Sequence, residues 1–194
     1  MRAALCSDAI ITSGGVSVGE ADYTKAMMKK LGDVAFWRIA MRPGRPMAVG
    51  HILRDKLASN PYLASESSSE KESNFKGSAV LFGLPGNPVA VMVTFLAFVR
   101  PALLRLMGCT ASAPPLLKAH SLEAIRKKPG RTEYQRGTVS TAPDGTLQVK
   151  TTGNQGSGVL SSMVQANGLI VLHHHQGNVA VDELVDVMMF EGVV

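Results

Sequence analysis

The sequence predicts an α/β domain built on a parallel sheet, followed by a small all-β domain that forms a barrel or a sandwich. In residues 1–112, nearly continuous apolar runs lead into glycine- or proline-rich turns and then into helical patterns, as in the buried strands of parallel sheets. The segment ASAPP at 111–115 is typical of a linker. Beyond it the helical period disappears, so we predict a second domain at residues 113–194.

The first domain is predicted to begin with a strand, a loop and a helix. Residues 3–12 form an apolar run that favours a buried strand, and SGGVSVGE at 13–20 follows as a glycine-rich loop. Residues 20–31 contain good helix formers, acidic residues in the first turn and lysines in the last, with Gly32 as a stop. Residues 34–41 then favour a second strand, which gives the order of a right-handed parallel crossover.

Two non-regular segments follow this second strand. RPGRP at 42–46 is predicted to be a loop, because its two prolines exclude regular pairing. Residues 54–77 are dominated by serine and charge without an apolar period, and they predict a mobile surface insertion.

A strand at 78–83 and a helix complete the first domain. LPGNP at 84–88 leads into the helix, for which Asn87 is the expected cap and Pro88 the first residue. Pro101 is expected to kink or end this helix.

The second domain is predicted from short β-type stretches separated by PGR, PDG, NQG, ANG and QGN turns. The expected strands lie at 138–142, 147–152, 169–173 and 184–190.

Composition limits the function. The chain has 194 residues, a net charge of +5 and a pI near 9.4, which favours an anionic partner. Basic and aromatic residues are not interleaved, so small phosphates fit better than nucleic acid. The longest apolar run, 89–99, is short of the ~20 residues that cross a bilayer, and we expect neither a membrane span nor a leader. Cys6 and Cys109 show no metal or disulfide spacing, and the chain is predicted to be cytoplasmic.

The glycine-rich loop is a candidate anion site. A loop between a buried strand and a helix start presents backbone N–H groups and the positive end of the helix dipole. Gly14, Gly15, Ser17 and Gly19 would then bind a phosphate. The alternative, that these glycines serve only packing and turning, is equally favoured by the residues alone. The loop lacks the spacing of a P-loop or a Rossmann fingerprint.

Charged residues lie close to this loop in the sequence. Arg38, Arg42 and Arg45 end the second predicted strand, where open α/β sheets bind ligands, and arginine forks match oxyanions. LPGNP ends another strand and should line the same crevice. Asp22 is either a helix-dipole acid or a group that holds a metal ion or a water.

The β domain offers weaker candidates. GRTEYQRG at 130–137 and GNQGSG at 153–158 are a basic segment and a polar loop, or plain turns. Ser157 lacks a nucleophile elbow. The histidines at 173–175 alternate faces if they lie in a strand, which disfavours a metal site.

Six segments in order resemble the carboxyl-terminal half of the MoeA family of molybdopterin molybdenumtransferases, which includes the gephyrin E domain. These segments are TSGGVSVGEADYTK, FWRIAMRPGRPMAVG, FGLPGNPVAVMVTF with PALLRLMG, GRTEYQRG and GNQGSGVLSSMVQANGL. The resemblance implies a molybdopterin-binding α/β domain shared with MogA, here only in part, and a carboxyl-terminal β domain.

The resemblance also implies an activity: an enzyme that inserts molybdenum from molybdate into adenylylated molybdopterin, with Mg²⁺ required and AMP released. It further implies a homodimer of the full-length protein and a MogA-type partner. The implied catalytic residues are Asp22, which is also the metal residue, Arg38 and Arg42; the family usually has lysine at both basic positions. The substrate-binding residues are those that the resemblance implies or that are expected to line the crevice: Gly14, Gly15, Ser17, Gly19, Arg45, Pro85, Gly86, Asn87, Pro88, Arg136 and Ser157.

Two other functions stay open. A MogA-like adenylyltransferase is disfavoured by the β domain, and a non-catalytic scaffold of the gephyrin type would not need the acid at Asp22. By comparison with the family, the chain begins at about the third strand of the α/β domain and lacks a TGDE-type loop. It is therefore expected to be an incomplete fragment of the insertase.

Overall fold

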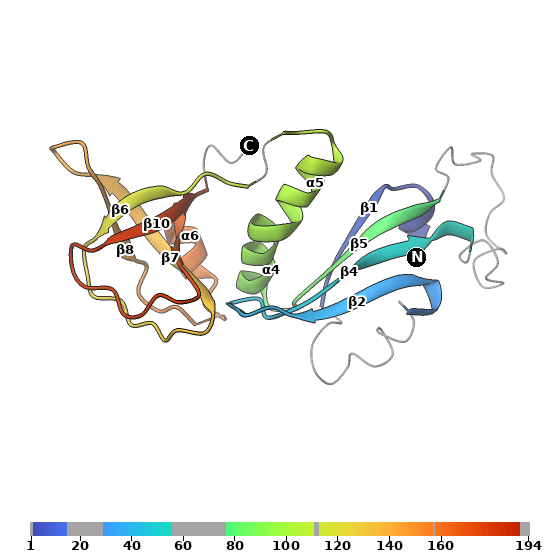
Figure 1. The fold of residues 1–194 in the computed structure, drawn as a ribbon, viewed down its shortest axis with the longest axis horizontal. Helices are drawn as coiled ribbons and strands as arrows, with labels where there is room; N and C mark the ends of the chain where they lie inside the picture. Colours follow the sequence, from blue (N-terminus) through green and yellow to red (C-terminus); the bar gives the residue numbers. More distant parts are fainter. Residues whose placement is uncertain (1, 15–28, 56–76, 111–112, 157, 191–194) are drawn as a thin grey trace. The chain divides into compact units, whose positions relative to one another are not determined.

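The computed structural model describes residues 2–14, 29–55, 77–110, 113–156 and 158–190 (Figure 1). The chain divides into two compact units. The first unit comprises residues 1–39 and 46–86, and the second comprises residues 40–45 and 87–194. The domain boundary expected near residue 112 stays a prediction.

The first unit contains a four-stranded sheet with the order β1-β5-β4-β2 (Figure 1). Its strands are β1 (Ala9–Ser13), β2 (Gly32–Arg38), β4 (Pro46–Leu53) and β5 (Ser78–Leu84). β1 and β5 pair in parallel, whereas β4 is antiparallel to both of its neighbours. The sheet is therefore mixed, with a parallel pair at one edge.

Three sequence predictions for this unit are corrected. Arg2–Leu5 forms a 3-10 helix, so the strand predicted at 3–12 starts only at Ala9. β2 is not a neighbour of β1, because β5 and β4 lie between them. β4 was missed because the prolines of RPGRP suggested a loop; Pro46 in fact begins the strand and pairs with Arg38, a position that proline tolerates.

Arg54 explains why the first residues do not form a strand. Its guanidinium is buried and donates hydrogen bonds to the carbonyls of Ala4 (2.9 Å) and Ser7 (2.8 Å). These carbonyls are satisfied by a side chain instead of a neighbouring strand. The predicted insertion thus begins with a buried residue, and its residues 56–76 lie outside the described part of the chain.

The helix predicted after LPGNP forms as expected at its start. α4 (Pro88–Thr94) has Pro88 in its first turn, and the Asn87 side chain accepts a hydrogen bond from the Ala90 N–H at 3.2 Å. The helix does not end at Pro101. A π-helical turn, η2 (Phe95–Val99), precedes α5 (Arg100–Leu106), and the Arg100 N–H bonds back to the Phe95 carbonyl. The wider turn lets the helix pass the proline.

This continuation changes one property of the helix. Pro88–Leu106 is 19 residues long with a mean hydropathy of 1.9, and 28% of the most apolar window is buried. By length and composition alone it could cross a membrane, in contrast to the shorter run at 89–99. A single such helix is weak evidence, because core helices of soluble proteins pass the same test.

The second unit contains a closed five-stranded barrel with one added strand. The barrel strands are β6 (Leu117–Ser121), β7 (Thr132–Thr141), β8 (Leu147–Thr151), β9 (Gly168–Leu172) and β10 (Leu184–Met189). The sheet order is β3-β7-β8-β6-β10-β9, and the additional β7–β9 pairing closes it. The short strand β3 (Met41–Arg42) joins β7 in parallel.

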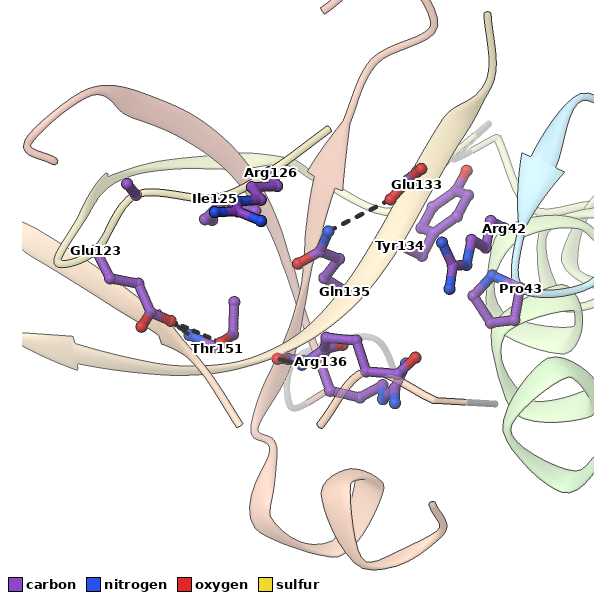
Figure 2. A pocket seen from close by; sticks show the side chains of 12 residues that line it. Arg42, Pro43, Glu123, Ile125, Arg126, Glu133, Tyr134, Gln135, Arg136 and Thr151 are labelled. Carbon is purple, nitrogen blue, oxygen red and sulfur yellow. Dashed lines mark hydrogen bonds between the residues drawn. The ribbon is translucent and has the colours of Figure 1, made fainter. Parts of the chain in front are cut away.

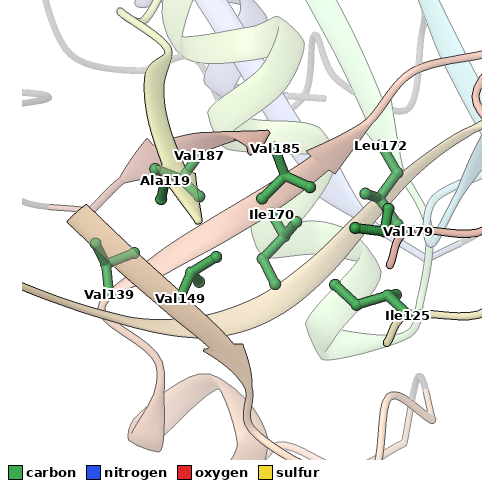
Figure 3. Close-up of a cluster of buried hydrophobic side chains, with 9 residues drawn as sticks. All are labelled: Ala119, Ile125, Val139, Val149, Ile170, Leu172, Val179, Val185 and Val187. Carbon is green, nitrogen blue, oxygen red and sulfur yellow. The ribbon is translucent and has the colours of Figure 1, made fainter. Parts of the chain in front are cut away.

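Aliphatic side chains from all five strands fill the barrel (Figure 3). Val149, Ile170, Leu172 and Val187 have no exposed surface. Gly137 makes room for them, because a Cβ there would lie 2.9 Å from side-chain atoms of both Ile170 and Val149. The prediction of an all-β barrel is confirmed.

Sequence reasoning missed parts of this unit. It took GRTEYQRG as a basic segment or a plain turn, but β7 begins at Thr132 and runs through it. It also missed β6 and the short helix α6 (Ser161–Gln165). Polar residues on β7 hid the strand because they face a polar cavity and not the barrel core.

Lowering the pH is expected to weaken the barrel through Asp186. Its mostly buried carboxylate binds Lys118 Nζ at 2.8 Å and His173 Nε2 at 2.6 Å. Burial raises the pKa of Asp186, but the hydrogen bonds and charges of Lys118 and His173 outweigh burial and leave the pKa below its ordinary value. The contribution to stability is therefore present above the unfolded pKa of ~3.9 and is lost as pH falls through the folded pKa.

The expected result is that Asp186→Asn costs about 1–2 kcal/mol of unfolding free energy at pH 7. Between pH 5 and pH 3 the variant should lose less stability than the natural chain. Urea unfolding followed by NMR signals of β10 measures both. If the free energy of unfolding of the two proteins falls equally between pH 5 and pH 3, this carboxylate does not govern stability in acid.

Candidate functional site

The second unit contains a cavity of about 300 Å³ beside β3 and β7 (Figure 2). It is lined by Arg42, Pro43, Glu123, Ala124, Ile125, Arg126, Glu133, Tyr134, Gln135, Arg136, Thr151 and Gln155. Most of these side chains are polar or charged, so the cavity is more polar than most small-molecule pockets and suits a charged ligand.

Arg42 reaches the cavity because the RPGRP turn is fixed on both sides. Met41 and Arg42 pair with Thr132 and Glu133 of β7. Gly44 has φ +97, and a Cβ at this position would lie 2.4 Å from Thr94 Cγ2. The turn thus packs directly on α4, while the Arg42 side chain stays exposed.

Arg136 is the most unusual residue of the site, because its guanidinium is buried without a carboxylate among its partners. The residue is 1% exposed. Nε donates to Ser162 Oγ at 2.9 Å, Nη1 to the Gln155 carbonyl at 3.2 Å, and Nη2 to the carbonyls of Asn154 and Gly156.

The charge of Arg136 is costly in this environment. Burial lowers the pKa of Arg136, and the nearby positive charge of Arg42 lowers it further. Two cations therefore share a cavity, one of them desolvated. An anion bound in the cavity would offset both costs.

A second set of hydrogen bonds holds the loop that Arg136 contacts. The Gln155 amide pairs with the Arg136 backbone: Oε1 accepts from the Arg136 N–H at 2.8 Å, and Nε2 donates to its carbonyl at 3.0 Å. The Gly156 N–H donates to Asn154 Oδ1 at 2.8 Å. Residues 154–156 are thus wrapped around Arg136.

The two carboxylates of the cavity already have partners (Figure 2). Glu123 Oε1 accepts from the Thr151 N–H at 2.7 Å and from its hydroxyl at 2.6 Å. Glu133 binds Arg131 Nε at 3.0 Å and Gln135 Nε2 at 3.4 Å. Within the described residues, neither acid forms an ion pair with Arg42 or Arg136, so the cavity keeps its positive charge.

The first unit brings together the two loops predicted from the sequence. Gly14 has φ +87, and its N–H donates to the Leu84 carbonyl at 3.0 Å. A Cβ on Gly86 would lie 3.5 Å from the Gly14 Cα. The glycine-rich loop and LPGNP therefore start side by side at the carboxyl ends of β1 and β5. Beside them, Thr12 Oγ1 is buried and has no hydrogen-bond partner among the residues that the structure describes.

Several predicted site residues lie outside the described part of the chain: Gly15, Ser17, Gly19, Asp22 and Ser157. Arg38 ends β2 in the first unit and is exposed, whereas Arg42 and Arg45 belong to the second. Of these three arginines, only Arg42 lines the cavity. Pro85 is buried in the first unit, and Asn87 and Pro88 begin α4.

Sequence reasoning named only Arg42 and Arg136 among the lining residues of the cavity. Glu133, Gln135 and Gln155 lay in the weaker candidate segments at 130–137 and 153–158 without being named, and Glu123 and Arg126 lay outside every candidate segment. The dense polar pattern of GRTEYQRG was an available signal, since a strand with so many polar groups needs a polar environment. Glu123 and Arg126 gave no sequence signal.

The two units together define a class of protein. One contains a mixed α/β sheet with a glycine turn at the carboxyl ends of its parallel strands, and the other a barrel with an arginine-lined cavity. Both features are those of a protein that binds oxyanions or phosphorylated small molecules.

Comparison with known proteins gives the particular family. Residues 1–105 match the family described as "Probable molybdopterin binding domain", and residues 118–190 match the MoeA C-terminal region, domain IV. The chain belongs to the molybdopterin-binding-domain family, with the MoeA carboxyl-terminal domain attached.

Curated relatives agree with this assignment. The chain is 38% identical to a molybdopterin molybdenumtransferase of Haemophilus influenzae over 185 residues, which are 95% of this chain and 40% of the relative. It is 34% identical to gephyrin of Dictyostelium discoideum over 190 residues, 94% of this chain and 25% of that protein. The chain therefore spans two fifths or less of these relatives.

Solved structures support the fold. A molybdopterin biosynthesis MoeA protein of Pyrococcus horikoshii aligns with a TM-score of 0.63 and 24% identity, covering 95% of this chain and 38% of that one. A molybdenum cofactor biosynthesis protein of Pyrococcus furiosus aligns with a TM-score of 0.61 and 23% identity, covering 94% and 49%.

Proposed function

We propose that the chain acts in molybdenum cofactor biosynthesis as the carboxyl-terminal part of a molybdopterin molybdenumtransferase. The reaction is the insertion of molybdenum from molybdate into adenylylated molybdopterin, with release of AMP. One observation carries the proposal: Arg136 is buried beside Arg42 in a cavity of about 300 Å³, and among the described residues neither guanidinium forms an ion pair with a carboxylate. The similarity to named transferases supports the reaction.

The residues of the cavity fit a tetrahedral dianion such as molybdate. Arg42 has a guanidinium that no described ion pair occupies, and it can donate two parallel hydrogen bonds to oxyanion oxygens. Arg136 Nη1 has one N–H that the described hydrogen bonds do not use. Arg42 would therefore bind the anion through hydrogen bonds, while Arg136 supplies a fixed positive charge beside the anion.

The remaining parts of the proposal rest on the family resemblance. They are a Mg²⁺ requirement, a homodimer of the full-length protein and a MogA-type partner. A cytoplasmic location is proposed from the sequence itself. Asp22 is the proposed Mg²⁺ residue and lies outside the described residues; those described contain no group of three or more side chains that could hold a metal ion. A MogA-type adenylyltransferase is less well supported, because residues 118–190 match the MoeA carboxyl-terminal region.

Calorimetric titration with molybdate tests the proposed site. We expect saturable binding by the natural chain and at least about tenfold weaker binding by Arg42→Gln, since one charge-assisted contact is lost. Arg105→Gln is the matched control, because it removes an exposed arginine of α5 away from the cavity. Equal affinity of Arg42→Gln and the natural chain would contradict the proposal, as would absence of binding by the folded chain.

A further inference from the structure

A second depression of about 640 Å³ lies in the same unit, next to the segment RKKPGR at 126–131. We refer to it as the basic groove. Its described lining contains Arg42, Arg126, Lys127, Lys128, Arg131 and Asn178, with Glu133 as the one acid among the described residues. Five cations against one carboxylate create a strongly positive surface.

The basic groove is built on a fixed backbone. Ile125 and Val179 exchange both backbone hydrogen bonds at 2.9 Å. The Lys127 N–H donates to Asn178 Oδ1 at 2.9 Å, and the Gly130 N–H donates to the His174 carbonyl at 2.9 Å. The segment is thus held at its start and near its end, which lowers the entropy lost when its side chains bind a ligand.

Lys127 anchors the segment from inside. The residue is 4% exposed, and its ammonium donates to the Gln176 carbonyl at 2.7 Å. Burial lowers the pKa of Lys127, although the charge of Glu133 raises it in part. Arg126 and Lys128 on either side of it are exposed at the groove.

The described residues balance the positive charge of the basic groove only in part. Glu133 is bound to Arg131 at 3.0 Å. In the described residues, Arg42, Arg126 and Lys128 form no ion pair. A bound anion with several charged oxygens would satisfy all three at once.

Arg42, Arg126 and Glu133 line both the basic groove and the smaller cavity. The two sites are therefore adjacent and share Arg42. The smaller cavity has the size and donors for a single oxyanion, whereas the basic groove is about twice as large.

We infer that the basic groove is a second anion site, which binds the phosphate groups of a phosphorylated small molecule while the neighbouring cavity binds molybdate. Arg126 and Lys128 are its exposed cations beside Lys127, and of the two only Lys128 lines the basic groove alone. This inference rests on the proposed function, because it assigns the phosphate end of the substrate to a place beside the oxyanion.

Titration with inorganic pyrophosphate, and separately with molybdate, tests the second site in the whole chain. We expect Arg126→Gln/Lys128→Gln to weaken pyrophosphate binding by about tenfold or more. The single variant Lys128→Gln should also weaken pyrophosphate binding, and its molybdate Kd should change by less than about threefold, because Lys128 does not line the molybdate cavity and Arg42, Arg126 and Arg136 are intact. Both replaced residues are exposed, so the fold should be retained, as circular dichroism would verify.

Arg105→Gln/Lys150→Gln is the matched control, since it removes the same two charges from exposed positions outside the basic groove. An equal loss of pyrophosphate affinity in this control would overturn the inference, because only net charge would then matter. Unchanged pyrophosphate binding by Arg126→Gln/Lys128→Gln would also overturn it.

Two further outcomes separate this inference from the proposed function. If the natural chain binds molybdate but not pyrophosphate, the second site is wrong and the first stands. If it binds pyrophosphate through Arg126 and Lys128 but not molybdate, the second site stands and the first is wrong. If saturating molybdate abolishes pyrophosphate binding, the two anions share one site and the inference fails.

Discussion

Replacing Gly44 by alanine is expected to displace Arg42 from the cavity and to destabilise the second unit by about 2–4 kcal/mol. Two costs add. The backbone at φ +97 is strained for a residue with a Cβ, and that Cβ would lie 2.4 Å from Thr94 Cγ2. Thr94 is fully buried and tied to the Ala90 carbonyl at 2.7 Å, so it cannot yield easily.

The turn would then move instead of the helix. Because Arg42 is two residues from Gly44, a shift of the turn breaks its pairing with β7 and moves its guanidinium. We expect molybdate affinity to fall by at least about tenfold. Urea unfolding and calorimetry measure the two effects.

Thr94→Ser separates the two costs. This change removes the methyl group in the way and keeps the hydroxyl that bonds to Ala90. In the double variant Gly44→Ala/Thr94→Ser, part of the stability should return, while the strain from φ remains. The single variant Thr94→Ser reports the cost of the lost methyl alone. Natural molybdate affinity in Gly44→Ala would show that the turn does not position Arg42.

Local sequence patterns correctly predicted the elements whose structure depends only on neighbouring residues. Asn87 and Pro88 form the expected cap and first turn of α4, and β5 follows the apolar run at 78–84. Gly32 ends a helix, since Lys29–Leu31 is helical and β2 starts at Gly32. These features depend on residues within a few positions of one another.

Elements decided by distant partners were predicted less well. The strand expected at 3–12 is shortened because Arg54, about 50 residues away, binds the carbonyls of Ala4 and Ser7. β3 exists because Met41 and Arg42 meet Thr132 and Glu133. The hydrophobic periodicity within either segment does not reveal these distant partners.

The candidate site shows the same difference between features set by nearby residues and features set by distant ones. Arg42 was a candidate from its place after a strand and from the resemblance, and Arg136 from the resemblance alone; both line the cavity. The burial of Arg136 and its bonds to a loop 18 to 20 residues further on were not predictable, because they depend on how β7 and that loop fold together.

Among changes that conserve charge, Arg136→Lys is expected to have the largest effect. It should lower the free energy of unfolding by about 3 kcal/mol and abolish molybdate binding. Lysine keeps the charge but ends in one ammonium with three donors on a different geometry. It cannot reach Ser162 and the carbonyls of Asn154, Gln155 and Gly156 together. The loop at 153–156 would lose its central partner, and a buried charge would be left with fewer hydrogen bonds.

Hydrogen exchange of the Gly156 and Arg136 amides reads out the loop directly, because both amides are bonded to loop side chains. We expect faster exchange at both in Arg136→Lys. Ser162→Ala is the graded control: it removes the contact to Nε and the hydrogen bond of the hydroxyl to the Val159 carbonyl, and should cost about 1–2 kcal/mol with nearly natural exchange at Gly156. If Arg136→Lys exchanges and binds molybdate like the natural chain, the positive charge alone suffices, and the arginine geometry has no part in building the site. If exchange accelerates and molybdate affinity falls together, the buried fork of Arg136 couples the order of the loop to the oxyanion cavity.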